Sequence, residues 1–306
     1  EKREIDKELV YLAHSFERVM PGIGYYDSLV NYWRVYAGRT SGAADVCEEF
    51  LSTLINVEQY PLKRLASMTA SEATKVLENS YRAVNIAFID EWTKYSELIG
   101  IDLYEIVDAV RVRPTHSNIR SPGLGVGGYC LTKDPLFAPA SLDGLFNIDG
   151  PEFIFSKLAM EVNQKMPLHA VERLSTLMNE ELENKNILIM GVSYKGDIGD
   201  SRFSPSELLV RTLKNRGANI VCFDPFLTYW PEMEQPLLSE LPDAAQYDAV
   251  VFATAHRQFY ELDILSWLKG KQLVILDAVN VMSENQRRIC RQSGVIVETI
   301  GRGNGL

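Results

Sequence analysis

A cysteine follows a run of glycines in the middle of the chain, and a lysine and an aspartate follow it closely. The segment reads Gly123-Leu-Gly-Val-Gly-Gly-Tyr-Cys-Leu-Thr-Lys-Asp-Pro135, so Cys130 precedes Lys133 by three residues and Asp134 by four. Glycine lets the backbone approach a ligand, an ammonium beside a thiol favours the thiolate, and a carboxylate can orient water. The spacing indicates covalent catalysis by a cysteine. The alternative is an inert cysteine buried in a glycine-rich turn.

Two further clusters carry groups that suit oxyanion and acid–base chemistry. Lys75 and Asn79 are four residues apart in a segment without Pro or Gly, so on a helix they share a face and could stabilise an oxyanion. Glu17 follows a predicted strand, where catalytic residues often lie in α/β folds, and is a candidate general base. A solvated helix face and a surface-loop glutamate are the alternatives.

An anion-binding loop is predicted between a strand and a helix near residue 200. It reads Gly191-Val-Ser-Tyr-Lys-Gly-Asp-Ile-Gly-Asp-Ser-Arg-Phe-Ser-Pro205. Backbone N–H groups at a helix N-terminus favour phosphate, and Lys195 and Arg202 add positive charge. The glycines lack the GxGxxG spacing, so an ordinary strand-to-helix loop is the alternative. Downstream, Asp224 could meet a ligand hydroxyl or simply start a turn.

The elements that position these groups follow from hydrophobic periodicity and helix caps. The first part of the chain predicts strands at 9–13 and 33–37 and helices at 41–55, 71–100, 102–112 and 151–179. Ser41 is expected to cap one helix and Pro167 to break or restart another. Residues 113–134 are expected to form a loop. The remainder predicts strands at 186–190, 219–223, 249–253, 272–276 and 295–297 and helices at 204–216, 262–268 and 283–293. This alternation predicts an α/β fold with a doubly wound parallel sheet.

Composition narrows the class of protein. The 306 residues predict two or three domains, and 46% hydrophobic with 24% charged residues is typical of globular proteins. A formal net charge of −10 argues against nucleic-acid binding, and no apolar run reaches the ~20 residues of a membrane span. Cys47, Cys130, Cys222 and Cys290 are far apart without metal-ligand spacing, which favours a reduced, cytoplasmic protein without a metal.

Taken in this order, the segments resemble the UDP-glucose/GDP-mannose dehydrogenase family, from about Leu9 to the C-terminus. The most specific element, Gly127-Gly-Tyr-Cys-Leu-Thr-Lys-Asp134, is similar to the family's GGxCxxKD signature. The other matching segments are 17–22, 72–79, 85–91, 191–205, 254–256 and 277–280. The resemblance implies an NAD-dependent nucleotide-sugar 6-dehydrogenase of polysaccharide biosynthesis, which oxidises the C6 hydroxymethyl of a UDP- or GDP-sugar to a carboxylate.

The resemblance also implies a mechanism and a set of site residues. NAD takes a hydride from C6, Cys130 attacks the aldehyde to give a thiohemiacetal, and a second NAD oxidises this to a thioester. Water activated near Asp134 or Glu17 then releases the acid, while Lys75 and Asn79 stabilise the oxyanion. The implied substrate-binding residues are Gly127, Gly128, Tyr129, Lys133, Lys195, Arg202, Arg113 and Arg120. Arg113 and Arg120 would reach the ligand of a neighbouring subunit, and Arg202 is also a candidate NAD contact.

Two departures from the family pattern matter. The family begins with a glycine-rich NAD fingerprint, and nothing of that kind is present here. We therefore expect the main NAD site to be missing from this chain, NAD to bind weakly or not at all, and the polypeptide alone not to turn over. Val279 stands where the family usually has a nucleotide-binding arginine, so nucleotide specificity is open.

The family pattern divides the chain into three parts. Residues 1–66 are expected to be the C-terminal remnant of an NAD-binding domain, 67–180 a central helical dimerisation domain with the cysteine loop, and 181–306 a UDP-sugar-binding domain. A homodimer through the long central helix is implied, with no nucleic-acid or membrane partner.

The sequence motifs disagree on the identity of the sugar. The Lys133-Asp134 pair resembles the glucose and mannose branches, whereas residues 122–128 and Pro135 resemble the N-acetylhexosamine branch. UDP-glucose is favoured, with a UDP-N-acetylhexosamine or GDP-mannose as alternatives. Two other classes stay open: a nucleotide-sugar-binding module without catalysis, and a hydroxyacid or sugar-phosphate dehydrogenase that needs no cysteine.

Overall fold

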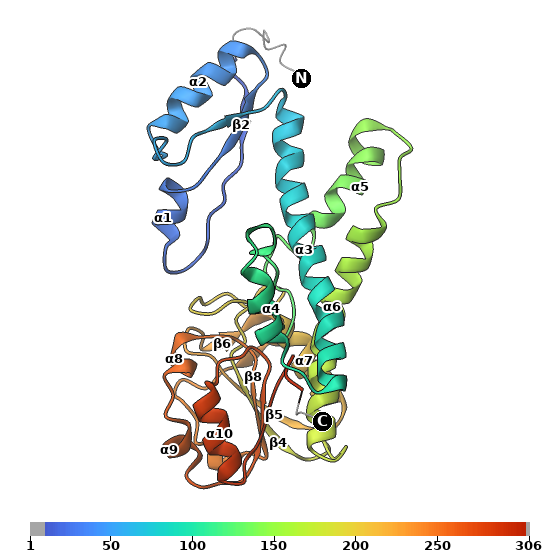
Figure 1. Cartoon of the computed structure of the whole chain (residues 1–306), viewed down its shortest axis with the longest axis vertical. Coiled ribbons are helices and arrows are strands. Elements are labelled where there is room, and N and C mark those ends of the chain that lie inside the picture. The colour runs from blue at the N-terminus through green and yellow to red at the C-terminus, as the bar shows by residue number, and fades with distance from the viewer. Residues whose placement is uncertain (1–9, 304–306) are drawn as a thin grey trace. The chain divides into compact units, whose positions relative to one another are not determined.

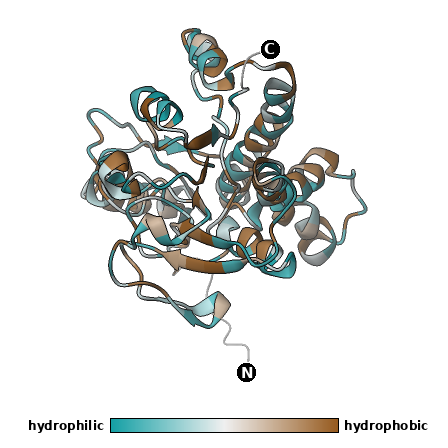
Figure 2. Ribbon diagram, turned by 90° about the horizontal axis from the view of Figure 1, so that it is seen from below, coloured by the Kyte–Doolittle hydropathy of each residue, from teal (hydrophilic) through white to brown (hydrophobic). Residues whose placement is uncertain are grey.

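The computed structural model describes residues 10–303 of the chain (Figure 1). The described residues divide into two compact units: 10–80 with Phe137–Asp149, and Tyr81–Leu136 with 150–303. The helices carry both hydrophobic and hydrophilic residues (Figure 2). Within the described range, the helices are all too short or too polar to cross a membrane.

The first unit contains a small sheet covered by one helix. Strand β1 (Ala13–Ser15) pairs antiparallel with β2 (Val35–Gly38), and β2 pairs parallel with β3 (Lys63–Arg64). Helix α1 is Tyr25–Val30, and α2 (Ser41–Ser52) packs on β2. Helix α5 (Phe137–Ser141) and a π-helical turn (Leu142–Phe146) complete the unit. The sequence did not predict these two elements, and it did not predict α1 or β3.

Two local predictions in this unit are wrong. Of the strand predicted at 9–13, residues 10–12 lie outside β1, which begins at Ala13 because its partner β2 ends opposite it at Gly38; Leu9 lies outside the described residues. The N-cap of α2 is Thr40 and not Ser41: the Thr40 side chain accepts a hydrogen bond from Ala43 N.

The long central helix is confirmed as α3 (Met68–Ile99), which is uninterrupted over 32 residues and runs from the first unit into the second. It is followed by α4 (Leu103–Arg111), capped by Asp102, and by short 3-10 turns at Pro114–His116 and Asp134–Leu136. Helix α6 (Ile154–Leu177) contains Pro167 without a break, contrary to expectation. A buried helix face that includes Met166, Ala170 and Leu174 offsets the missing backbone hydrogen bond.

The predicted doubly wound sheet is confirmed in the second unit. Its parallel strands, in the order β10-β9-β8-β4-β5, are β10 (Ile296–Thr299), β9 (Val274–Asp277), β8 (Ala249–Phe252), β4 (Asn186–Met190) and β5 (Asn219–Phe223). The helices are α7 (Pro205–Asn215), α8 (Arg257–Tyr260), α9 (Ile264–Leu268) and α10 (Glu284–Gln292). A small hairpin of β6 (Tyr229–Trp230) and β7 (Gln235–Pro236), with a 3-10 turn at Pro231–Met233 between them, and a further 3-10 turn at Ala244–Gln246 were not predicted.

Both faces of this sheet are buried. Ile187 and Ile189 of β4 belong to the hydrophobic cluster with α6 and α7, whereas Leu188 and Met190 belong to the cluster with α8, α9 and α10. From β4 the chain moves outward to β5 and then crosses back to β8 on the other side of β4. In open α/β sheets, ligands bind beyond the carboxyl ends of strands at such a reversal. The expected position is therefore the loop that follows β4.

Candidate active site

The glycine turn presents Cys130 at the protein surface. Gly128 has φ +80°, a conformation that favours glycine. The amides of Lys133 and Asp134 both donate to the Cys130 carbonyl, at 3.2 and 2.9 Å, so the cysteine begins a single helical turn. Cys130 is exposed, whereas Cys222 and Cys290 are buried. This exposure argues against an inert, buried thiol at position 130.

A lysine–aspartate pair lies in the turn that follows. Lys133 Nζ is 2.9 Å from Asp134 Oδ1 and 4.3 Å from the centroid of the Tyr129 ring. The hydrogen bond to Asp134 raises the pKa of Lys133, with Tyr129 and Cys130 contributing in the same direction. The ammonium therefore stays charged beside the cysteine turn, while the carboxylate of Asp134 is buried beneath it.

The cysteine turn is packed against the loop between β4 and α7. Gly128 N donates to Arg202 O at 3.2 Å, and the Tyr129 and Phe203 rings are 6.0 Å apart. A Cβ atom on Gly127 would lie 2.7 Å from Phe203 O, so only glycine permits this approach. Two motifs that are far apart in the sequence thus form one surface.

The loop after β4 is fixed from beneath by a buried aspartate–histidine pair. Asp224 Oδ2 accepts from Val192 N and Ser193 N, each at 2.9 Å, and from His256 Nε2 at 3.1 Å. His256 Nδ1 accepts from Asp197 N at 3.0 Å, which requires a neutral imidazole with its proton on Nε2. Burial opposes ionisation of Asp224, but the His256 and backbone hydrogen bonds outweigh it and lower the pKa of Asp224.

Asp224 also starts a turn, because its Oδ1 accepts from Phe226 N at 3.0 Å. Both carboxylate oxygens are therefore used within the protein. Of the two sequence interpretations, the turn describes this residue, and the ligand hydroxyl does not. His256 was not predicted to support the loop, since no local pattern links it to Asp224.

The two cations proposed for the loop both reach the protein surface. Lys195 is exposed. Arg202 is also exposed and is held by Asp200, with Nη2–Oδ2 at 2.6 Å and Nε–Oδ1 at 2.9 Å, an interaction that raises the pKa of Arg202. A phosphate at this loop would share Arg202 with Asp200.

Arg113 and Arg120 lie in the segment between α4 and the cysteine turn. Arg113 is exposed, whereas Arg120 is half-buried and its amide donates to Asn85 Oδ1 at 3.0 Å. Burial, together with the neighbouring Arg82, lowers the pKa of Arg120, and its buried Nε has no hydrogen-bond acceptor in the described part of the chain. An anion beside Arg120 would stabilise the charge of the guanidinium and accept the hydrogen bond of its Nε.

Glu17, Lys75 and Asn79 lie in the first unit. Lys75 Nζ donates to Glu17 O at 3.0 Å and lies 4.0 Å from Glu17 Oε1. Asn79 is buried, and the exposed Glu17 carboxylate accepts from Val19 N. The structure thus brings Glu17 and Lys75 together, while Cys130, Lys133 and Asp134 belong to the second unit.

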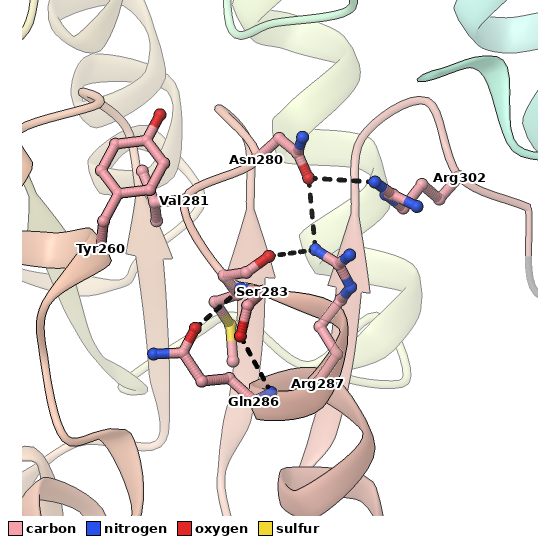
Figure 3. Close-up of a pocket in the computed structure, with 8 residues that line it drawn as sticks. Tyr260, Asn280, Val281, Ser283, Gln286, Arg287 and Arg302 are labelled. Carbon is pink, nitrogen blue, oxygen red and sulfur yellow. Dashed lines mark hydrogen bonds between the residues drawn. The ribbon is translucent and has the colours of Figure 1, made fainter. Parts of the chain in front are cut away.

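A pocket of about 540 Å³ opens near the carboxyl end of β9 (Figure 3). Tyr260 stands on one side, and Arg287 and Arg302 stand on the other. Asn280 Oδ1 accepts from Arg287 Nη1 at 3.2 Å and from Arg302 Nη2 at 3.4 Å. These two arginines were not predicted. They place positive charge next to Val279, where the family pattern has an arginine.

The described residues do not fit an NAD pyrophosphate. After β2 the chain enters α2 through Arg39 and the capping residue Thr40, and the sequence here has no GxGxxG spacing. Within residues 10–303, no group of three His, Cys, Asp or Glu side chains could hold a metal ion.

Comparison with known proteins places this site in a family. The central-domain model of the UDP-glucose/GDP-mannose dehydrogenase family matches residues 69–165, and the UDP-binding-domain model of the same family matches residues 188–284. The UDP-N-acetyl-D-mannosamine dehydrogenase of Methanocaldococcus jannaschii is 32% identical over 302 residues, which are 96% of this chain and 65% of that protein.

Solved structures agree with these matches. UDP-D-ManNAc dehydrogenase from Pyrococcus horikoshii superposes with a TM-score of 0.78 at 27% identity, over 95% of this chain and 65% of that one. NDP-N-acetyl-D-galactosaminuronic acid dehydrogenase from Methanosarcina mazei gives a TM-score of 0.81 at 27% identity, over 96% and 62%. The chain therefore spans about two thirds of the length of its relatives. The matches to both domains, with the fold they share, show that this chain belongs to the UDP-glucose/GDP-mannose dehydrogenase family.

Proposed function

We propose that the chain supplies the cysteine and the nucleotide-sugar site of an NAD-dependent UDP-N-acetylhexosamine 6-dehydrogenase. The observation that carries the proposal is an exposed Cys130 on a glycine turn that hydrogen-bonds to the loop after β4. The relatives named as UDP-N-acetyl-D-mannosamine dehydrogenases favour the N-acetylhexosamine alternative over the UDP-glucose expected from the Lys133-Asp134 pair.

In the proposed reaction, Cys130 forms and later releases a covalent intermediate. Its sulfur adds to the C6 aldehyde of the sugar, and the new oxyanion is stabilised by Lys75 and Asn79. After oxidation to the thioester, water attacks the carbonyl, the C–S bond breaks, and the sulfur leaves as thiolate. Asp134 or Glu17 takes the proton of that water. The family resemblance assigns both hydride transfers to NAD, for which the described residues offer no fitting site, so only the addition and the hydrolysis are ascribed to this chain.

The diphosphate is proposed to bind along the loop after β4. Lys195 and Arg202 supply charge, and the helix dipole of α7, which begins at Pro205, favours an anion at this end. Gly127, Gly128, Tyr129 and Lys133 would contact the sugar from the facing turn. We retain the division into residues 1–66, 67–180 and 181–306 as a proposal, with the last part as the UDP-sugar domain.

A homodimer through the second-unit part of α3 is also proposed. Phe88, Trp92 and Tyr95 are 48%, 41% and 50% exposed, and they form a continuous aromatic row with ring centroids 6.2 and 5.5 Å apart. Apolar side chains in such a row are stabilised when a partner surface removes them from water. In the dimer, Arg113 and Arg120 of one subunit would reach the ligand of the other.

A thermal-shift panel tests the nucleotide-sugar site. UDP, UDP-N-acetylmannosamine, UDP-glucose and GDP-mannose are compared, because a ligand that binds the folded state raises the unfolding temperature. We expect the largest shift from UDP-N-acetylmannosamine, a smaller shift for Lys195→Ala, and an unchanged shift for the exposed control Lys271→Ala. Equal, negligible shifts with all four compounds would contradict the proposal.

A non-catalytic nucleotide-sugar-binding module is the second candidate, because binding along the loop after β4 does not itself require a reactive Cys130. The two functions differ at Cys130. A thiohemiacetal between Cys130 and the 6-aldehyde of the sugar nucleotide, seen by native mass spectrometry and absent from Cys130→Ser, supports the dehydrogenase. Binding of the sugar nucleotide by a Cys130→Ser variant is expected under either function.

A further inference from the structure

Tyr194 belongs to the candidate diphosphate loop, and its side chain lies against the cysteine turn. It immediately precedes Lys195 in the loop, and its side chain runs along the Gly127–Gly128 peptide. A Cβ atom on Gly127 would lie 2.6 Å from Tyr194 Cβ, and one on Gly128 would lie 2.8 Å from Tyr194 Cε2 and 3.0 Å from Tyr194 Cζ. The two glycines thus allow the tyrosine side chain to lie directly on the backbone of the turn.

On the loop side, the backbone around Tyr194 is rigidly held. Tyr194 N donates to Asp200 O at 2.9 Å, across the loop. The preceding residue, Ser193, donates its N–H to buried Asp224, and its carbonyl accepts from Thr254 Oγ1 at 2.6 Å. The backbone of this segment therefore has little freedom to move. A ligand that contacts Lys195 would mainly displace the side chains of Lys195 and Tyr194.

On the other side, the contact leads directly to the cysteine. Gly128 is held by Tyr194 on one arm of the loop and by the carbonyl of Arg202 on the other arm. Cys130 follows Gly128 by two residues and begins the helical turn that carries Lys133. A displacement of the Tyr194 side chain would consequently move the turn that carries the sulfur, because densely packed groups transmit small displacements.

We propose that Tyr194 is a positioning residue that couples a nucleotide diphosphate on the loop of residues 191–205 to the placement of Cys130. The inference rests on the proposed function, since it takes this loop as the diphosphate site. Coupling between two sites typically changes one equilibrium or reactivity by about fivefold or more when the other site is occupied. Tyr194 carries that coupling through the face of its ring, so the hydroxyl is dispensable.

The experiment measures the reactivity of Cys130 with and without UDP. Iodoacetamide labelling is followed by peptide mass spectrometry, with the half-buried Cys47 as an internal reference. The variants are Tyr194→Ala, the conservative Tyr194→Phe, and Tyr229→Ala as a control at an exposed tyrosine of the β6–β7 hairpin. UDP binding to each variant is measured separately by calorimetry, and folding by thermal unfolding.

We expect saturating UDP to change the Cys130 labelling rate about fivefold or more in the unchanged protein, in Tyr194→Phe and in Tyr229→Ala. In Tyr194→Ala, UDP still binds but leaves the labelling rate unchanged. A purely structural role would lower the unfolding temperature and leave the UDP effect intact, and an intact effect in Tyr194→Ala overturns the inference.

Failure of the proposed function gives a different signature. If UDP produces no binding heat with the unchanged protein, the diphosphate site itself is wrong and the coupling falls with it. If UDP binds and protects Cys130 equally in every variant, only the role of Tyr194 is wrong. Should Tyr194→Ala not fold, Tyr194→Leu keeps an apolar side chain without the ring and is judged by the same two outcomes.

Discussion

Replacing Asp224 with alanine tests the support of the loop after β4. The side chain is 2% exposed, and its two oxygens accept four hydrogen bonds: from Val192 N, Ser193 N, His256 Nε2 and Phe226 N. Alanine removes every acceptor while the donors stay in place. The loop that carries Lys195 then loses the carboxylate that holds its first residues.

The size of the effect follows from the pairing. A buried donor left without an acceptor costs about 1–3 kcal/mol, and Asp224→Ala leaves up to four such donors. These costs overlap, because water can enter the space left by the carboxylate and accept some of the bonds. We therefore expect the Asp224→Ala variant to lose about 3 kcal/mol or more of unfolding free energy. Asp224→Asn keeps the volume and one acceptor oxygen and should lose about 1–3 kcal/mol.

Urea unfolding followed by tryptophan fluorescence provides the assay, since Trp230 and Trp267 are both buried in the doubly wound domain. Hydrogen exchange at the amides of Val192 and Ser193 gives the local readout. An Asp224→Ala variant within about 1 kcal/mol of the unchanged protein would refute the reasoning, because several buried donors would then have lost their acceptor at almost no cost. Undiminished protection of the two amides would refute it equally.

The pH dependence gives an independent check. The folded pKa of Asp224 is lowered relative to the unfolded value of about 3.9. Its stabilisation is therefore complete above about pH 4 and is lost as pH falls through the lower folded pKa. Burial raises the pKa of Asp277, so its contribution has the opposite sign: it is present below about pH 4 and is lost as pH rises through the folded pKa. At pH 7, Asp277→Asn should consequently cost less than Asp224→Asn.

Three further predictions concern the turn, the dimer and the cofactor. Gly128→Ala, at φ +80° against the Tyr194 ring, should destabilise the protein by about 1–2 kcal/mol in thermal or urea unfolding, and unchanged stability would mean that the turn can rearrange. Trp92→Arg should convert the proposed dimer to a monomer in light scattering, whereas an unchanged mass would place the interface elsewhere. Calorimetry should detect no tight NAD binding to this chain, and a micromolar dissociation constant would show that the described residues form a site by another route.

Sequence alone determined the features that depend on neighbours along the chain. Helix α7 begins where Ser204 caps it and Pro205 fits its first turn, and Gly217 follows its end with φ +84°. The strands of the parallel sheet are continuous apolar runs, because both faces are buried. The spacing of Cys130 and Lys133 likewise indicated that both residues share one turn, as they do in the structure, whereas the reactivity of the thiol stays a prediction.

Only the tertiary structure decided how distant segments meet. The pairing of Asp224 with His256 depends on the crossing of the chain from β5 to β8. These two strands lie on either side of β4, and the two residues follow their carboxyl ends. The contact of Gly127 and Gly128 with Tyr194 has no signal in either motif, since glycine suits any close approach. Pro167 stays within α6 because buried neighbours compensate for a hydrogen bond that local rules count as lost. These outcomes depend on strand order and packing, and both are set by contacts between residues that no short sequence window contains.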